Sequence, residues 1–327
     1  MQENTILAIS SFLLTIVASL IIIPILKKIK IGQIERTDGP QSHLKKQGTP
    51  TLGGVIFILA IVICTIGYYV KSKSNNPNDS YFRNGVLTLL LSIGFGIVGF
   101  IDDFKKLVLK NTKGLKPSYK MIGLFLSSVL YTIFIIRFSR YGTDIIIPII
   151  KKQITIPIIF YIPFAILVML GTTNAVNLTD GIDGLASSVC AIIISCLTVI
   201  AIINSVEEMV ILGIIVVGSI LGFLMFNLHP AKVFMGDTGS LFLGGLISAM
   251  ALYLKVPLIL IIIAIIPIVE TLSVMIQVSY YKKTGNRIFK MAPIHHHFEL
   301  SGWNENKVVR VFSVITLIAC ILGIVII

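Results

Sequence analysis

Two adjacent carboxylates mark the first position where this sequence could do chemistry on a phosphate. Asp102 and Asp103 end an apolar run, and six lysines follow them by residue 120. Adjacent carboxylates repel one another, so a bound cation or a shared proton would stabilise the pair. Taken alone, the pair is more simply explained as a solvated helix end with a basic flank.

A second acidic segment, residues 177–184, reads Asn-Leu-Thr-Asp-Gly-Ile-Asp-Gly and joins two apolar runs. Asp180 and Asp183 are three residues apart, so a helix beginning at 180–184 would project both carboxylates to one face. The glycines would let the backbone approach a ligand closely. A tight turn capped by the Asp side chains is the alternative.

Two glycine-rich segments also begin apolar runs. Residues 234–240 read Phe-Met-Gly-Asp-Thr-Gly-Ser, which offers free amides, hydroxyls and a carboxylate to a phosphate and a hard divalent cation. Residues 48–54, Gly-Thr-Pro-Thr-Leu-Gly-Gly, follow Lys45 and Lys46 but lack the spacing of a P-loop. Each segment alone is equally consistent with an ordinary helix start.

Three consecutive histidines, His295, His296 and His297, lie within residues 291–299, Met-Ala-Pro-Ile-His-His-His-Phe-Glu. Neighbouring side chains diverge, so the three imidazoles are poorly placed to bind one metal ion. A zinc site would prefer histidines at helical spacing such as i and i+4. We expect one or two of them to contact phosphate or to orient a carboxylate, and a polar surface loop is the alternative.

The composition identifies the elements that must position these residues. Of the 327 residues, 55% are hydrophobic and only 13% are charged, and the mean hydropathy is +0.95. Soluble globular chains carry about 25% charged residues. We therefore exclude a soluble enzyme and expect an all-α polytopic membrane protein with a single integral-membrane domain over residues 1–327. The four cysteines lie in apolar runs without metal-ligand spacing, so no disulfide framework is expected.

Ten apolar runs are candidate transmembrane helices. They cover residues 6–26, 51–70, 84–101, 121–138, 157–176, 184–203, 209–228, 239–254, 257–281 and 308–327. Pro267 and Glu270 interrupt the ninth run, where proline predicts a kink and an intramembrane acid is a functional candidate or pairs with a buried partner. Between the fourth and fifth runs, β-branched residues of segment 143–157 flank a Lys151-Lys152 turn and predict a short β-hairpin.

Basic residues set the expected orientation of these helices. One set of connections holds 19 of the 27 Lys and Arg residues, and the opposite set holds 8. The positive-inside rule places the first set in the cytoplasm and both termini outside. The connections of this first set are 27–50, 102–120, 177–183, 229–238 and 282–310.

Polar chemistry is concentrated on the same predicted face. The cytoplasmic connections hold nine of the fifteen acidic residues and all five histidines. Carboxylate oxygens suit Mg²⁺ that bridges phosphates, and lysines add point charges for the same groups. The residues together predict Mg²⁺-dependent chemistry on a phosphorylated substrate at the cytoplasmic membrane surface.

These five motifs together resemble the polyprenyl-phosphate N-acetylhexosamine-1-phosphate transferase superfamily, from about residue 30 to the last span. Residues 291–300, followed by Gly302-Trp303, are similar to the phospho-N-acetylmuramoyl-pentapeptide transferases within it. One departure is Leu52, where the family usually has Met, and this exchange conserves volume.

The resemblance implies the reaction and its setting. A phospho-MurNAc-pentapeptide group would pass from its UDP carrier to undecaprenyl phosphate, giving lipid I and UMP for peptidoglycan synthesis, with Mg²⁺ as cofactor. The family's architecture implies ten transmembrane helices, outer termini, a broken ninth helix beside a lipid groove, and a homodimer in the bacterial cytoplasmic membrane. The active site would face the cytoplasm. Direct attack by the lipid phosphate and a phospho-enzyme intermediate on an Asp both fit.

The resemblance also implies roles for matching residues. Asp237 would bind Mg²⁺, while Asp102 and Asp103 would form a catalytic pair that supplies a base or a second cation site. His295, His296 and His297 would orient phosphates or the peptide-bearing sugar. The substrate-binding residues would be Lys46, Lys110 and Lys120 for phosphate, Asn177, Asp180, Gly181 and Asp183 for the nucleotide and sugar phosphate, and Phe234 on uracil with Asn227 and Gln277 nearby.

Three other functions compete with this prediction. A related transferase would move GlcNAc-1-phosphate to the same lipid, although its relatives show a different histidine pattern. An ion-coupled transporter would place its coupling acids near the midplane within an inverted repeat, whereas the acids here, Glu270 apart, gather on one side. A structural membrane scaffold would leave that one-sided gathering unexplained.

Overall fold

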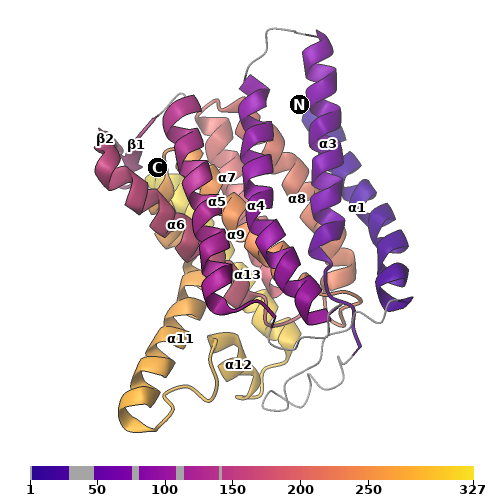
Figure 1. Cartoon of the computed structure of the whole chain (residues 1–327), viewed down its shortest axis with the longest axis vertical. Helices are drawn as coiled ribbons and strands as arrows, with labels where there is room; N and C mark the ends of the chain where they lie inside the picture. The colour runs from indigo at the N-terminus through magenta and orange to yellow at the C-terminus, as the bar shows by residue number, and fades with distance from the viewer. Residues whose placement is uncertain (1, 29–47, 76–80, 108–113, 140–141) are drawn as a thin grey trace.

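The computed structural model describes residues 2–28, 48–75, 81–107, 114–139 and 142–327 (Figure 1). Long helices make up most of this part of the chain, as its apolar runs predict. The longer helices are α1 (Gln2–Lys28), α3 (Gly54–Asn75), α4 (Tyr81–Leu107), α5 (Pro117–Phe138), α6 (Ile158–Thr179), α7 (Leu185–Ile203), α8 (Glu207–Asn227), α9 (Gly236–Tyr253), α11 (Ile265–Thr284) and α13 (Glu305–Ile326). The shorter elements are β1 (Asp144–Ile147), β2 (Lys152–Thr155), η1 (Pro257–Ile259), α10 (Leu260–Ile263) and α12 (Ile294–Glu299).

Eight helices of the described chain are long and apolar enough to cross a membrane, and nine if one bent pair forms a single span. The eight are α1, α3, α4, α5, α6, α7, α8 and α13. The predicted run 239–254 also folds as a helix, α9, but its glycines and polar first turn keep it out of this set. The multi-pass helical fold is therefore confirmed, while the count of ten spans stays a prediction.

The bent pair lies where the sequence predicts a kink. The segment Pro257–Ile263 and α11 meet at an angle of 79°. The break falls at Ala264, three residues before Pro267, which lies in the first turn of α11. Proline has no N–H for the carbonyl four residues earlier, Ile263, and its ring clashes with that carbonyl. The helix therefore breaks before the proline, and α11 leaves the bundle at its lower end (Figure 1).

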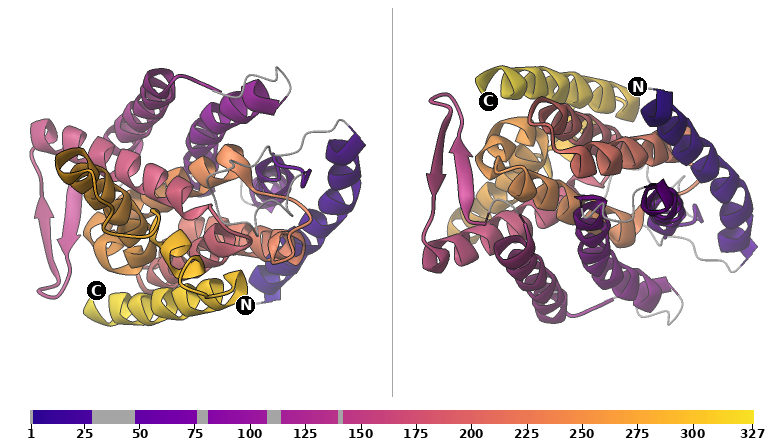
Figure 2. Two further views of the ribbon diagram at one scale, coloured as in Figure 1. Left: turned by 90° about the horizontal axis from the view of Figure 1, so that it is seen from below. Right: turned by 90° about the horizontal axis from the view of Figure 1, so that it is seen from above.

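Helix α9 lies at the centre of the bundle, with α4 and α6 packed closely against it and α3 and α7 also in contact (Figure 2). Its residues from Thr238 to Tyr253 are buried. Glycines let α4 approach its first turn closely, since a Cβ at Gly99 would overlap the backbone of Asp237. This close approach brings the acidic end of α4 beside the start of α9.

The predicted hairpin is present at the opposite end of the bundle. Strands β1 and β2 are antiparallel, with Asp144 opposite Thr155 and Ile147 opposite Lys152. The turn covers residues 148–151, so Lys152 belongs to the strand and not to the turn as predicted. Helix α1 begins and α13 ends at this same end (Figure 1).

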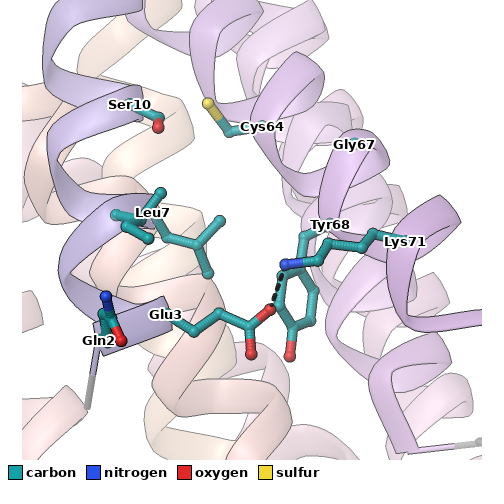
Figure 3. A pocket seen from close by; sticks show the side chains of 9 residues that line it. Gln2, Glu3, Leu7, Ser10, Cys64, Gly67, Tyr68 and Lys71 are labelled. Carbon is teal, nitrogen blue, oxygen red and sulfur yellow. Dashed lines mark hydrogen bonds and ion pairs between the residues drawn. The ribbon is translucent and has the colours of Figure 1, made fainter. Parts of the chain in front are cut away.

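Among the residues that the structure describes, polar contacts at the hairpin end join helices without forming a carboxylate cluster. Tyr253 donates a hydrogen bond to Glu208 (2.7 Å) and accepts one from Asn84 (3.0 Å), and all three side chains are buried. A pocket between α1 and α3 is crossed by the ion pair of Glu3 and Lys71 at 2.7 Å (Figure 3). These contacts link α4, α8 and α9, and α1 to α3, far from the acidic segments.

Candidate functional site

Asp237, in the first turn of α9, is the centre of the polar cluster. Its Oδ2 atom accepts from the ammonium groups of Lys106 (2.9 Å) and Lys120 (3.1 Å), and its Oδ1 atom accepts from the amide of Asn177 (2.8 Å). The Asn177 amide also donates to Ser240 at 2.8 Å. Helices α4, α5, α6 and α9 therefore bring the predicted residues Asp237, Lys120 and Asn177 together.

The adjacent acids of α4 have different partners. Asp102 binds Lys106 through Oδ2 (2.8 Å) and accepts the N–H of Leu115 through Oδ1 (2.6 Å), so it joins the lysine cluster. Asp103 accepts the N–H groups of Asp237 (3.2 Å) and Thr238 (2.9 Å). Successive helical residues point about 100° apart, which separates the two carboxylates. Asp103 thus caps the start of α9, while Asp102 faces the cations.

Lys106 belongs to the cluster, although sequence reasoning did not include it among the site residues. One ammonium group bridges the carboxylates of Asp102 and Asp237. The spacing of Asp102 and Lys106, i and i+4 on one helix, is the signal that could have identified it. Lys46 and Lys110, which were predicted as phosphate ligands, lie outside the described residues.

The segment 180–184 forms a turn between α6 and α7, so of the two alternatives the tight turn is present and the helix start is not. Helix α7 begins only at Leu185, because Gly184 adopts the left-handed conformation at φ 75°. Burial raises the pKa of the Asp180 carboxyl to about 8, and the negative charges of Asp237, Asp103 and Asp183 add to the rise. Asp180 therefore belongs to the same electrostatic group as Asp237.

Asp183 has partners of its own, which sequence reasoning did not identify. Its Oδ2 atom lies 3.0 Å from Nδ1 of His229 and accepts the N–H of Ala231 at 3.0 Å. Its backbone N–H donates to Glu305 at 3.2 Å. Ligand atoms of Asp183, His229 and Glu305 lie within 4.8 Å of one another, a spacing that could hold a metal ion. These contacts connect the 180–184 turn, the segment between α8 and α9, and the start of α13.

The three histidines point to three different places, as their adjacency predicts. His295 is fully buried, with Nδ1 3.1 Å from Glu270 of α11. His296 pairs with Glu299 at 2.8 Å, and His297 accepts the backbone N–H of Lys290 at 3.2 Å. The rings of His295 and His296 are nevertheless close, with their centres 4.1 Å apart.

The glycine-rich segments 48–54 and 234–240 lie side by side. The N–H groups of Gly53 and Gly54 donate to the carbonyls of Phe234 and Met235, both at 2.8 Å, and the N–H of Phe234 donates to Pro50 at 2.8 Å. This pairing fixes the backbone on either side of Phe234, whose side chain is half-buried. It also sets the entry into α9.

Asn227 and Gln277 use their amide groups to hold other segments. Asn227 is buried, accepts from Ser187 at 2.7 Å and donates to the carbonyl of Val233 at 3.0 Å. Gln277 accepts the N–H groups of Ile288 (3.1 Å) and Phe289 (3.0 Å) and donates to the Phe289 carbonyl (3.0 Å). Asn227 therefore holds the segment that leads to Phe234, and Gln277 holds the loop that precedes α12.

The carboxylate oxygens of Asp237 and Asp102 are ligands of the kind that a magnesium ion prefers. Mg²⁺ binds one or two carboxylates, with waters and substrate phosphates completing its octahedron. The carboxylates of Asp237 and Asp102 both reach the same ammonium group of Lys106, so a cation at that position would meet two hard oxygen ligands. The side chain of Asp237 is 18% exposed, which leaves this position accessible.

Comparison with known proteins identifies one matching family model and relatives that all carry the same name. Residues 86–255, just over half of the chain, match the family model of glycosyl transferase family 4. The chain is 49% identical to a phospho-N-acetylmuramoyl-pentapeptide-transferase of Clostridium botulinum (strain Alaska E43 / Type E3), over 95% of this chain and 93% of that protein. It is 45% identical to a protein of the same name in Acetivibrio thermocellus, over 96% of this chain and 92% of that protein.

A third relative, the phospho-N-acetylmuramoyl-pentapeptide-transferase of Clostridium perfringens (strain 13 / Type A), is 48% identical over 96% of this chain and 95% of its own length. The matched region includes Asp102, Asp103, Asn177 and Asp237, which the fold gathers at one end of the bundle. The chain has a multi-pass helical fold and is 48–49% identical to two of these relatives over nearly its full length. It therefore belongs to the phospho-N-acetylmuramoyl-pentapeptide-transferase family, within glycosyl transferase family 4.

Proposed function

We propose that this protein transfers the phospho-MurNAc-pentapeptide group from its UDP carrier to undecaprenyl phosphate, releasing UMP and forming lipid I for peptidoglycan synthesis. The observation that carries the proposal is the contact of Asp237 with Lys106, Lys120 and Asn177 at one end of the bundle. Family membership supports the choice of substrates.

The ammonium groups neutralise phosphate oxygens in this proposal. Lys106 and Lys120 both lie within 3.1 Å of Asp237, so a diphosphate entering here meets two cations beside two carboxylates. Asp237 and Asp102 would hold Mg²⁺, which supplies charge neutralisation for the leaving UMP phosphate. Asp103 keeps Asp237 in place through the first amides of α9.

Two routes give the same products. In the first, an oxygen of the lipid phosphate attacks the phosphorus that carries the sugar, and the bond from that phosphorus to the UMP oxygen breaks. In the second, an Asp carboxylate makes that attack and the lipid phosphate then displaces it. Exchange of labelled UMP into the UDP substrate without lipid is expected only for the second route.

The remaining parts of the proposal concern the membrane. The protein would be a homodimer with ten spans in the bacterial cytoplasmic membrane, its termini outside and its site toward the cytoplasm. The 19 Lys and Arg residues in one set of connections support this orientation. Labelling of single cysteines placed at residues 150 and 286 in intact cells tests it, because only position 150 is then expected to react with an impermeant reagent.

The test of function is UMP release by purified protein in detergent with lipid. UMP is expected only when UDP-MurNAc-pentapeptide, undecaprenyl phosphate and Mg²⁺ are all present, and EDTA should abolish it. UDP-GlcNAc in place of the peptide substrate separates the related transferase. The proposal would be overturned if the protein released UMP from UDP-GlcNAc but not from UDP-MurNAc-pentapeptide. It would also be overturned if folded protein released no UMP from either substrate.

A further inference from the structure

A buried acid–histidine pair joins the bent span to the turn that carries Asp180 and Asp183. Glu270 of α11 and His295 of α12 are both completely buried. Oε2 of Glu270 lies 3.1 Å from Nδ1 of His295 and accepts the backbone N–H of the same residue at 3.4 Å. An acid in a membrane-embedded helix is costly, so its retention calls for a reason.

The pair is not built for maximal hydrogen bonding. Among the described residues, Oε1 of Glu270 and the two ring nitrogens of His295 have no partner in hydrogen-bond geometry. Unsatisfied buried polar atoms lower stability, because they lose their hydrogen bonds to water without replacing them. A contact that served stability alone would be replaced favourably by apolar side chains of similar volume.

On the side away from Glu270, the imidazole of His295 contacts the turn between α6 and α7. Nε2 of His295 packs against Gly181 so closely that a Cβ at position 181 would overlap the ring. Gly181 lies directly after Asp180, and Asp183 follows two residues later in the same turn. The position of the ring therefore limits where this turn can lie relative to Asp237.

Glu270 also supports the start of α12. Pro293 precedes this helix and provides no side-chain cap, and the carboxylate of Glu270 receives the N–H of His295. Phe298 of α12 packs against Trp303 and Phe312, which fixes the other end of the helix. With α12 held at both ends, the orientation of the ring depends on the acid from α11.

We infer that Glu270 is a positioning residue of the transferase: it holds His295 against Gly181 and thereby fixes the Asp180–Asp183 turn for group transfer. The inference deepens the proposed function and rests on it. It also implies that His295, unlike His296 and His297, acts from behind the turn and not on the phosphates.

The test compares Glu270→Met and Glu270→Gln in the UMP-release assay with undecaprenyl phosphate in detergent. Met removes the acid at similar volume, so we expect an unchanged or higher Tm together with a kcat lower by about 10–100-fold. Gln keeps the side-chain volume and an oxygen that accepts the backbone N–H of His295, so we expect kcat within about fivefold of wild type. KM for the UDP substrate should change less than kcat, because Lys106 and Lys120 are untouched.

A double variant tests the pairing itself. If Glu270 acts through His295, Glu270→Met combined with His295→Ala should be no slower than His295→Ala alone. Glu208→Gln is the matched control, a buried acid at the other end of the bundle, and it should add nothing to the kcat loss in either background.

The outcomes separate the two proposals. A folded Glu270→Met protein with wild-type kcat, or kcat losses that multiply in the double variant, would overturn the positioning role while the transferase stands. Wild-type protein that releases no UMP would overturn the proposed function itself. A loss of Tm without loss of kcat per folded molecule would mark Glu270 as purely structural and also overturn the inference.

Discussion

The two ends of the helical bundle both bury acidic side chains, but they surround them differently. At the hairpin end, Glu208 accepts from the neutral hydroxyl of Tyr253, which in turn accepts from Asn84. At the other end, Asp102 and Asp237 share the ammonium group of Lys106. Neutral partners satisfy a single acid at little electrostatic cost, whereas clustered like charges need cations.

This difference indicates which end carries the chemistry. A protein that only needed a joint between helices could use the arrangement at Glu208. The cluster at Asp237 concentrates charges of both signs that a phosphate and a divalent cation could exchange with. Charge density around a buried acid, and not burial alone, therefore separates the functional end from the structural one.

Of the substitutions that test this difference between the two ends, that of Asp237 should change kcat the most. Asp237→Ala removes the acceptor of two ammonium groups and the proposed Mg²⁺ ligand, so kcat for UMP release should fall by at least about 10³-fold. Initial rates at saturating Mg²⁺ measure the loss. Glu208→Gln is the paired variant at the hairpin end and should keep kcat within about twofold, although its Tm should fall through the altered contact with Tyr253. Equal losses in the two variants would remove the distinction between the ends.

Lys106 is the next strongest test, with Lys105 as its neighbour on the same helix. Lys106→Ala removes the closer of the two ammonium groups that Asp102 and Asp237 share with Lys106 and Lys120, so we expect a loss of about 10–100-fold in kcat/KM. Lys105→Ala changes the net charge equally and should stay within about twofold. The pair is measured at two ionic strengths, and similar losses for both variants would reduce the effect to net charge.

The sequence predicted much of the fold from hydropathy alone. All ten predicted apolar runs are helical in the structure, and the hairpin at 143–157 lies where its β-branched residues indicated. Hydropathy measures only length and apolarity, so the span predicted at α9, a buried helix that begins with polar residues, stays a prediction. Pro267 predicted a kink and the resemblance implied a broken ninth helix, but the angle of 79° could not be predicted, because it depends on packing.

The site was predicted less completely, because side-chain partners depend on tertiary contacts. Asp237, Lys120 and Asn177 were predicted as site residues, and the structure brings their side chains into contact. The adjacency of Asp102 and Asp103 in the sequence could not show that Asp102 pairs with a lysine while Asp103 accepts the first N–H groups of α9. Asp183 contacts His229 and Glu305, which both lie far from it in the sequence. No rule of residue spacing could have paired them with Asp183.

Asp180 offers a test through stability. Its pKa is raised to about 8 in the folded protein, against about 3.9 in an unfolded chain, so the ionised carboxylate destabilises the fold. The cation-free protein should therefore lose stability as pH rises from about 4 to about 8 and change little above that range. Asp180→Asn should flatten this dependence and raise Tm by roughly 2–6 °C at pH 8 in EDTA. Thermal unfolding from pH 5 to 9 measures it.

The matched variant for this test is Glu207→Gln, an acid at the hairpin end in the first turn of α8. It should leave the pH dependence of Tm as in wild type. Mg²⁺ should shrink the advantage of Asp180→Asn, because a nearby cation offsets the negative charges that raise the pKa. A wild-type Tm that rises between pH 5 and 8 in EDTA would contradict the assigned sign.

Gln277 should have a smaller effect, because its role is to hold a loop beside the site. Gln277→Ala removes three hydrogen bonds to Ile288 and Phe289, so the 288–289 segment should become more mobile. We expect KM for the UDP substrate to rise about 3–10-fold with kcat nearly unchanged. Hydrogen exchange of the 285–293 loop is the second measurement, and faster exchange there without a change in KM would place the loop outside the substrate's path.

The smallest effect is expected at the hairpin, and it completes the comparison of the two ends. Asp144 accepts from Gln153 (2.7 Å) and Thr155 (2.6 Å) across the two strands, at an exposed position. Exposed polar contacts of this kind contribute on the order of 0.5–1 kcal/mol, so Asp144→Ala should lower Tm slightly and leave kcat and KM within about twofold. The hairpin also joins α13 through the N–H of Ile149 and the carbonyl of Ile326. If Asp144→Ala nevertheless lowered kcat as much as Lys106→Ala, the hairpin would have to act on the site through α13, and the two ends could no longer be treated as separate.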